Sequence, residues 1–348
     1  MLRARALSSP DIIVQYIKNG AGQFQTKTYR RFYGEIRDVA SGLLEAGVKR
    51  EDRAGIIADN RQEWLASDFG ILSIGAVDVP RGGDSTEQEL AYVLGFTGCT
   101  LVFAENQKQA MKLLPKTADL PALKILITYD PLDEEPARAF RARGIELYHY
   151  PDLLELGRKR RAIYPAEVEE EIDKGRRDDP VTIIFTSGTT GESKGVTLTH
   201  STFLHQLPSF PLIFEAKPGD IWLSVLPVWH VFERVIEYGI IYMASGIAYS
   251  KPISSVLLVD FQAVRPHWMV SVPRVWESIM DWSVRHVRQQ GRLRKSFFDF
   301  FVSAGILYNY FRDLTFGLLP NFHGRFRVLD AVLGFLPWLL LWPLRGLG

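Results

Sequence analysis

The sequence has one cysteine, Cys99, and no hydrophobic run long enough for a membrane-spanning helix. A single cysteine excludes an internal disulfide framework and a zinc site built on several cysteines, which fits a reducing compartment. We expect Cys99 to be a small buried apolar residue. The longest uncharged stretch near the end, 331–344, contains two prolines and falls short of the roughly 20 apolar residues of a spanning helix. This favours a buried or interfacial segment there.

Charge of one sign is also lacking, because 41 basic and 40 acidic side chains leave a formal net charge of +1. A nearly neutral chain gives no general electrostatic reason to bind nucleic acid, so any phosphate chemistry must be local. Residues 1–20 contain no apolar core of the length that a secretory signal needs, which predicts a cytoplasmic protein. With 348 residues, 47% of them hydrophobic, the chain can bury a large core.

Helical and strand patterns alternate from Thr28 onward. Phe32, Ile36, Val39 and Leu43 recur at helical spacing before Gly47, and short apolar strands are expected at 54–58, 76–80, 100–104 and 124–129. This alternation predicts an α/β fold with largely parallel sheets flanked by helices.

Two capping patterns predict where helices begin. Asn60 with Glu63, and Thr86 with Glu89, have the spacing of a capping box, in which the first side chain caps a helix and the acidic one reaches back. A mixed charge run over 155–180 is typical of a solvated helix face and a surface loop.

The segment 181–200, "VTIIFTSGTTGESKGVTLTH", leads from an apolar strand into a loop of glycines and hydroxyl residues. Glycines let backbone N–H groups approach phosphate oxygens, hydroxyls add donors, and a lysine adds a compact positive charge. A flexible linker would not normally follow a buried strand, and the spacing does not fit the P-loop pattern G-x-x-x-x-G-K-[ST]. The candidate phosphate-binding residues are Thr186, Ser187, Gly188, Thr189, Thr190, Gly191, Lys194 and Gly195.

This loop resembles the phosphate-binding signature of the adenylate-forming superfamily, T-S-G-T-T-G-x-P-K-G-V, with Ser193 in place of the proline. The superfamily includes acyl-CoA synthetases, luciferases and adenylation domains. The resemblance implies ATP and Mg²⁺ as cofactors, and the formation of an acyl adenylate whose carbonyl is then attacked by the thiol of coenzyme A.

A second segment, "LPVWHVFER", is similar to the L-P-x-x-H-x-x-E-R motif of long-chain acyl-CoA synthetases. The resemblance places His230 near the acyl carboxylate and the α-phosphate, and it makes His230 and Lys194 the candidate catalytic residues; taken alone, such a histidine is more often a core residue. A third segment, "VPRVWES", resembles the family's acyl-pocket helix, which Pro273 and Arg274 open. The candidate acyl-pocket residues are Trp229, His230, Phe232, Trp268, Val270, Val272, Pro273, Arg274 and Trp276. For Trp268, Val270, Val272 and Trp276, a core role is an equally good alternative.

Residues 285–301 place basic side chains just before Phe297, Phe298, Phe300 and Phe301. This pattern fits a family insertion whose aromatics pack on the main domain. The alternative is an interfacial segment that contacts the inner face of an anionic membrane.

The resemblance is incomplete. The superfamily also has a Y-G-x-T-E motif for Mg²⁺, a T-G-D motif for the ribose and a C-terminal lid domain with a lysine, and we identify none of them; Ile241 stands where the threonine would be. We therefore expect 1–180 to be a first α/β subdomain, 181–348 an incomplete phosphate-loop and acyl-pocket subdomain, and the chain to lack metal ligands and to be inactive alone.

The function that the resemblance implies is a long-chain fatty acid–CoA ligase, with fatty acid, ATP and coenzyme A as partners. The alternatives are a ligase for a different carboxylate and a non-catalytic lipid- or membrane-binding module.

Overall fold

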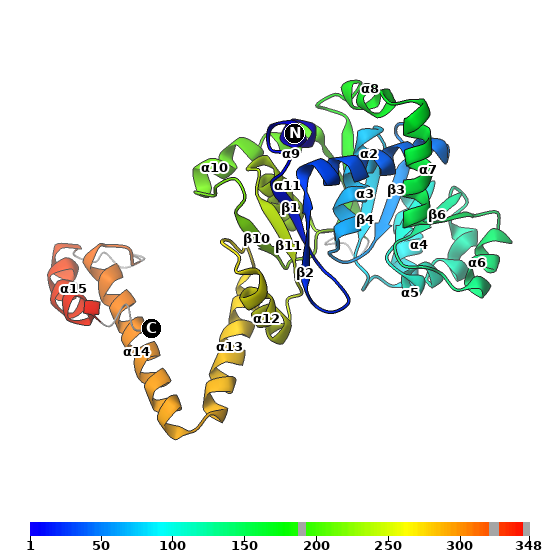
Figure 1. Cartoon of the computed structure of the whole chain (residues 1–348). Coiled ribbons are helices and arrows are strands. Elements are labelled where there is room, and N and C mark those ends of the chain that lie inside the picture. The colour runs from blue at the N-terminus through cyan, green and yellow to red at the C-terminus, as the bar shows by residue number, and fades with distance from the viewer. Residues whose placement is uncertain (187–192, 320–326, 344–348) are drawn as a thin grey trace. The chain divides into compact units, whose positions relative to one another are not determined.

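The computed structural model describes residues 1–186, 193–319 and 327–343 of the chain. They divide into two compact units, Met1–Ser271 and Val272–Gly348. The first contains the β-sheets with their flanking helices, and the second is helical (Figure 1).

The larger sheet of the first unit has seven described strands. Its strands β3 to β8 pair in parallel, and only β9 runs antiparallel, beside β8. The expected α/β fold with a largely parallel sheet is therefore confirmed. In spatial order the strands are β7 Glu146–His149, β6 Ile125–Thr128, β5 Leu101–Ala104, β3 Arg53–Ile57, β4 Val77–Arg81, β8 Pro180–Thr186 and β9 Lys194–Thr199.

Alternating side chains of this sheet belong to two separate cores. In β5, Leu101 and Phe103 belong to one buried cluster, whereas Val102 and Ala104 belong to the other. Successive side chains of a strand point to opposite faces, so the strand is buried on both sides. This explains why these strands read as continuous apolar runs in the sequence.

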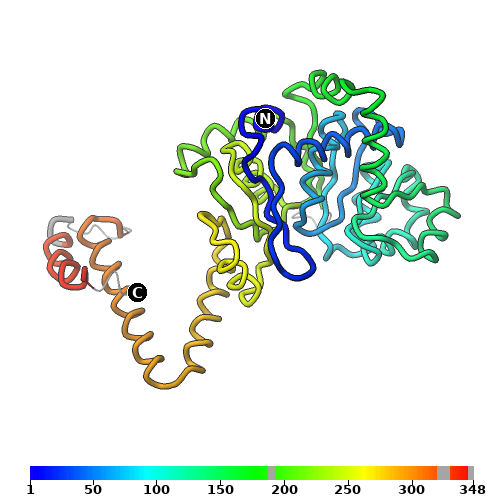
Figure 2. The backbone as a smooth tube through the Cα atoms, in the orientation of Figure 1, coloured from blue at the N-terminus to red at the C-terminus, as the bar shows by residue number. Residues whose placement is uncertain are grey.

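The smaller sheet joins the N-terminus to a much later part of the chain. Figure 2 shows the N-terminal hairpin beside strands from the middle of the sequence. β1 pairs in parallel with β11, and β2 pairs antiparallel with β1. In order, the strands are β10 Ile221–Ser224, β11 Gly246–Tyr249, β1 Ile13–Lys18 and β2 Phe24–Thr28.

Helices of the first unit connect these strands. They are α1 Leu2–Ser8, α2 Tyr29–Glu45, α3 Gln62–Ser73, α4 Glu87–Thr97, α5 Gln107–Met111, α6 Glu134–Arg141, α7 Tyr150–Ile163, α8 Glu167–Asp173, α9 His200–Leu204, α10 Phe210–Ile213, α11 Val231–Tyr242 and α12 Ser254–Val264, with the 3-10 helices η1 Leu114–Asp119 and η2 Leu207–Ser209.

The second unit consists of α13 Pro273–Gln289, α14 Arg292–Thr315 and α15 Arg327–Leu341. Pro337 lies inside α15. Within the described part of the chain, every helix is too short or too polar to cross a membrane.

The boundary after Ser271 separates two compact units of the fold, and it does not test the subdomain boundary that the sequence predicts after residue 180. β8 begins at Pro180 and adds to a sheet whose other parallel strands come earlier in the chain. The sequence-based subdomains 1–180 and 181–348 remain predictions.

The predicted local signals were mostly confirmed. Phe32, Ile36, Val39 and Leu43 are all buried on one face of α2, and Cys99 is buried, which raises the pKa of its thiol to about 12. Thr86 and Glu89 form the expected capping box of α4.

The predicted cap at Asn60 was wrong. The residue that precedes α3 is Arg61, which makes no side-chain cap, and the amide of Asn60 bonds elsewhere. A local pattern was overridden by partners distant in sequence, which are described below.

A buried ion cluster joins α11 to the larger sheet. The fully buried guanidinium of Arg234 pairs with Asp68 of α3 and Asp78 of β4. Its Nε donates to the Tyr238 hydroxyl at 3.0 Å, and that hydroxyl donates to Asp68 at 2.6 Å. On β8, the Thr182 hydroxyl donates to Asp78 at 2.7 Å. The cluster therefore ties one helix to another helix and two strands.

We expect Arg234→Met to lower the free energy of unfolding by about 3–5 kcal/mol, because it leaves two buried carboxylates without their counter-charge. Urea denaturation followed by circular dichroism measures the change. Arg138→Met is the matched control: it removes an exposed arginine that pairs with Glu134 on α6, and it should cost at most about 1 kcal/mol. Equal effects of the two substitutions would show that the cluster does not anchor α11.

Candidate functional site

The predicted phosphate loop is carried by a β-hairpin at the carboxyl edge of the larger sheet. Thr186 ends β8, and its cross-strand partner Lys194 begins β9; both are exposed. Ligands of parallel α/β sheets bind beyond the carboxyl ends of the strands, so the hairpin lies at a suitable edge. Ser187, Gly188, Thr189, Thr190 and Gly191 lie outside the described residues.

Gly195 follows Lys194 and faces Phe185 across the hairpin. A Cβ atom at this position would come within 3.1 Å of the Phe185 ring and 3.0 Å of the Ile183 side chain. The glycine thus lets the two strands pack closely just below the loop. Of the predicted phosphate-binding residues, the structure describes Thr186, Lys194 and Gly195, and it brings them together.

His230 lies at the start of α11, where a loop from β10 turns into the helix. Its Nδ1 accepts a hydrogen bond from the backbone N–H of Phe232 at 3.2 Å, so the ring caps the helix. Since Nδ1 is the acceptor, the proton of the neutral imidazole lies on Nε2. The ring is exposed, so Nε2–H can donate to an anionic ligand. The core role that a lone histidine suggests does not apply here.

Trp229 beside it is half-buried and packs over Gly82, in the loop after β4. A Cβ atom on Gly82 would lie 2.5 Å from the Trp229 Nε1 atom, closer than real contacts allow. Gly82 therefore leaves room for the indole, and the loops after β4 and β10 meet at the edge that carries His230.

Other predicted acyl-pocket residues are dispersed. Phe232 is 42% exposed on the first turn of α11. Trp268 stacks on Trp222 with ring centroids 5.4 Å apart, and its Nε1 donates to Asp220 at 2.9 Å; Val270 packs against the same core. Within the described structure, Trp268 therefore supports β10.

The remaining acyl-pocket candidates belong to the second unit. Pro273 opens α13, as the sequence predicted, and Val272, Arg274 and Trp276 lie within one turn of it, all exposed. An acyl pocket that includes residues of both units stays a prediction.

Glu233 and Glu237 form a buried acidic pair that the sequence analysis missed. They lie one helical turn apart on α11 and are 1% and 0% exposed. Burial raises the pKa of Glu233 to about 8, although hydrogen bonds from Ser224 and from the Val225 backbone favour its charged form. Burial and the neighbouring Glu233 charge raise the pKa of Glu237 well above its ordinary value. In the sequence, the signal for this pair is the i, i+4 spacing, which puts the two glutamates on one face of a helix.

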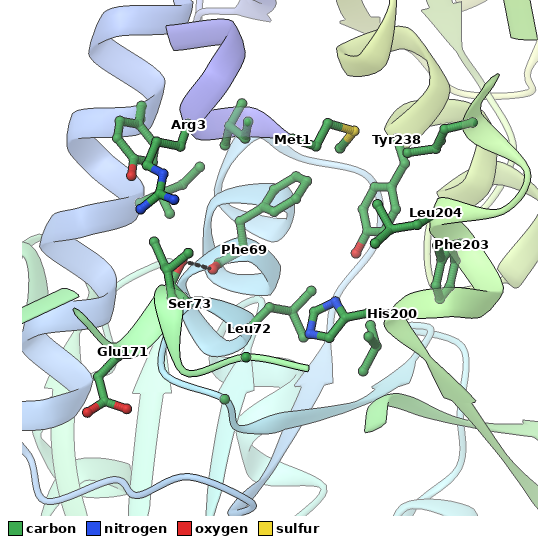
Figure 3. Close-up of a pocket in the computed structure, with 18 of the residues that line it drawn as sticks. Met1, Arg3, Phe69, Leu72, Ser73, Glu171, His200, Phe203, Leu204 and Tyr238 are labelled. Carbon is green, nitrogen blue, oxygen red and sulfur yellow. Dashed lines mark hydrogen bonds between the residues drawn. The ribbon is translucent and has the colours of Figure 1, made fainter. Parts of the chain in front are cut away.

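An apolar cavity of about 240 Å³ lies in the first unit, between α1, α3, α8, α9 and α11 (Figure 3). Figure 3 shows His200, Phe203 and Leu204 from α9 facing Phe69 and Leu72 of α3. Val181, near the amino end of β8, also lines it, whereas the predicted phosphate loop follows the carboxyl end of β8. The lining includes none of the predicted site residues that the structure describes.

The described residues can also be compared with the ligand sets that hold metal ions. In residues 1–186, 193–319 and 327–343, no group of three or more His, Cys, Asp and Glu side chains is arranged to hold a metal ion. Mg²⁺ is usually held by one or two carboxylates together with substrate phosphates, so this finding concerns only a site built entirely from protein side chains.

Solved structures share this fold. A Rhodopseudomonas palustris protein that was assigned by name as a long-chain-fatty-acid CoA ligase matches with a TM-score of 0.63 at 19% identity, covering 80% of this chain and 64% of that chain. An O-succinylbenzoate coenzyme A synthetase of Bacillus subtilis, solved with ATP and a magnesium ion, matches with a TM-score of 0.59 at 18% identity, covering 80% of this chain and 50% of that chain. The fold is therefore that of the adenylate-forming ligases.

The sequence comparison gives the family. The family model described as AMP-binding enzyme matches residues 2–306, so the chain belongs to the AMP-binding enzyme family. A chloroplastic long-chain-fatty-acid–[acyl-carrier-protein] ligase of Arabidopsis thaliana is 29% identical over 92% of this chain and 45% of its own length. A long-chain-fatty-acid–CoA ligase of Mycobacterium tuberculosis is 29% identical over 82% of this chain and 45% of its own length. This chain spans less than half the length of these curated relatives.

We predict that Glu233→Gln flattens the pH dependence of stability. Because the folded-state pKa of about 8 exceeds the ordinary value of about 4.3, the folded chain keeps a proton that the unfolded chain has lost between these pH values. The free energy of unfolding should therefore fall as the pH rises from about 4.5 to about 8. Removing one such group should reduce that slope by up to about 1.4 kcal/mol per pH unit.

Urea denaturation at a series of pH values measures the slope. Glu215→Gln, which changes an exposed glutamate of the same unit, should reproduce the unsubstituted curve. A Glu233→Gln slope identical to the unsubstituted one would mean that Glu233 is ionised in the folded chain.

Proposed function

We propose that this chain carries the phosphate-binding hairpin and part of the acyl site of an ATP-dependent ligase that activates a long-chain fatty acid. The observation that carries the proposal is that two elements lie at the carboxyl ends of neighbouring strands: the Thr186–Lys194 hairpin continues β8, and Trp229, beside His230, packs on Gly82 just after β4. Relatives named as long-chain fatty acid ligases support the choice of substrate.

The chemistry of this edge fits adenylation. A carboxylate is a poor electrophile until a good leaving group is attached, and transfer of AMP from ATP supplies one while pyrophosphate leaves. In this proposal the ammonium group of Lys194 neutralises charge on the phosphates. The exposed Nε2–H of His230 donates to a carboxylate or phosphate oxygen. Mg²⁺, when bound, would add further neutralisation of the polyphosphate.

The acceptor of the activated acyl group is proposed to be the thiol of coenzyme A. One relative is named for an acyl-carrier-protein acceptor, which makes such a protein thiol the second candidate. Supplying either acceptor to the loaded enzyme and measuring thioester formation distinguishes them.

The ligase function is tested with the chain joined to the remaining part of a related ligase. Lys194→Ala should then lower the apparent affinity for ATP or the adenylation rate about ten- to hundredfold, because one charge-assisted contact is worth roughly 1.5–3 kcal/mol. Steady-state pyrophosphate exchange with ATP varied at saturating fatty acid measures both quantities.

Lys108→Ala, at an exposed lysine on α5, is the control and should leave exchange unchanged. Lys194→Arg keeps the charge and should be less damaging than Lys194→Ala. Unchanged kinetics for Lys194→Ala would remove the phosphate-binding role from the hairpin.

We also propose that the second unit contacts an anionic membrane surface through the start of α14. Phe297 and Phe300 are 64% and 56% exposed there, next to Arg292, Arg294 and Lys295. Exposed aromatic side chains beside basic groups favour an interface with anionic lipid.

In sedimentation with phosphatidylcholine vesicles, we expect binding that increases when phosphatidylserine is included. The double substitution Phe297→Ser and Phe300→Ser should weaken it at least about tenfold, since burying one large apolar side chain is worth roughly 1.5–3 kcal/mol. Phe96→Ser, at an exposed phenylalanine of the first unit, is the matched control. Binding that the double variant retains would contradict the membrane proposal.

A further inference from the structure

The side chain of Asn60 reaches across from the larger sheet to the loop that carries His230. Asn60 follows β3, and its Nδ2 donates to the backbone carbonyl of Leu226 at 2.6 Å. Its Oδ1 accepts from the backbone N–H of Val228 at 2.8 Å. One amide thus satisfies a backbone acceptor and a backbone donor of the same loop.

The chemistry of the two backbone partners fixes the orientation of this amide. A carbonyl only accepts and an N–H only donates, so the amide nitrogen must face Leu226 and the amide oxygen must face Val228. The same Nδ2 lies 3.0 Å from the hydroxyl of Ser224, which donates to buried Glu237 at 2.9 Å. The contact therefore extends from the end of β3 through the end of β10 into α11.

A second asparagine in a similar place behaves differently. Asn106 follows β5, the neighbour of β3, and its Oδ1 accepts from the backbone N–H of Gln109 at 3.2 Å, which caps α5. Asn60 makes no such cap for α3. Two asparagines beyond the carboxyl ends of adjacent strands thus have different roles, one local and one across the two sheets.

We propose that Asn60 is a positioning residue, which holds the loop 225–230 by its backbone so that Trp229 and His230 lie at the shared edge of the two sheets. Its relevance to catalysis rests on the proposed function, whereas the anchoring of the loop does not. Gly82 also supports this loop, because the indole of Trp229 fills the space that a side chain would occupy.

Amide hydrogen exchange of the 348-residue chain tests the anchor without any substrate. Asn60→Leu keeps the size of the side chain and removes both loop hydrogen bonds. We expect the Val228 amide to exchange about tenfold faster, the factor that corresponds to 1.4 kcal/mol, while amides of β3 and β11 keep their rates. Asn106→Leu, the matched control, should speed exchange at Gln109 and leave Val228 unchanged.

A spectroscopic measurement uses a milder pair of variants, so the proposal can still be tested if Asn60→Leu does not fold. In the chain labelled with 5-fluorotryptophan, Trp229→Phe identifies the fluorine signal of Trp229. Asn60→Asp keeps an acceptor for Val228 and loses the donor to Leu226, so it should shift or broaden that signal. Asn106→Asp, which exchanges one good helix cap for another, should not.

Three results would overturn the proposal. Faster exchange confined to the first turn of α3 would make Asn60 a helix cap, and a uniform acceleration across the first unit would make it a general stability residue. An unmoved Trp229 signal in Asn60→Asp would likewise remove the positioning role. Because no nucleotide or fatty acid is present, these results stand apart from success or failure of the ligase assays.

Discussion

The buried charge of Arg234 is the constraint on which the arrangement of the site depends. A guanidinium removed from water is costly unless good geometry and further hydrogen bonds compensate, and here two aspartates and a tyrosine provide them. These partners come from α3, β4 and α11, and Thr182 brings in β8. The helix that begins beside His230 and the strand that ends at Thr186 are therefore held by one cluster.

This anchor explains why one short motif contains both exposed and buried polar residues. In "LPVWHVFER", His230 caps the helix at the open edge, while Glu233 and Arg234 enter the core on the first turn. The helical period turns successive side chains toward different surroundings, so a single segment can present a ligand-facing ring and secure itself to the sheet. The buried residues of the motif thus serve placement, and the exposed one is available for chemistry.

The sequence was sufficient where the signal is local or periodic. The spacing of Phe32, Ile36 and Val39, the Thr86–Glu89 capping box and the strand before Thr186 each depend on neighbours in the chain, and each was predicted. Asn60 fails for the opposite reason: its partner Val228 lies 168 residues away, so the nearby Glu63 gave a misleading cap. The acidic pair on α11 was missed because its i, i+4 spacing is also found on solvated helix faces, and its burial is what makes it unusual.

The elements that place His230 and Lys194 all belong to the first unit, so the first unit determines the geometry around these two residues. The larger sheet is covered on both faces by its own helices, so its carboxyl edge is supported by a core that residues before Val272 complete. Asn60 and Gly82 hold the His230 loop, and the β8–β9 pairing brings Lys194 opposite Thr186. The geometry of this edge therefore follows from contacts inside one compact unit, and it can be measured in the chain without substrate.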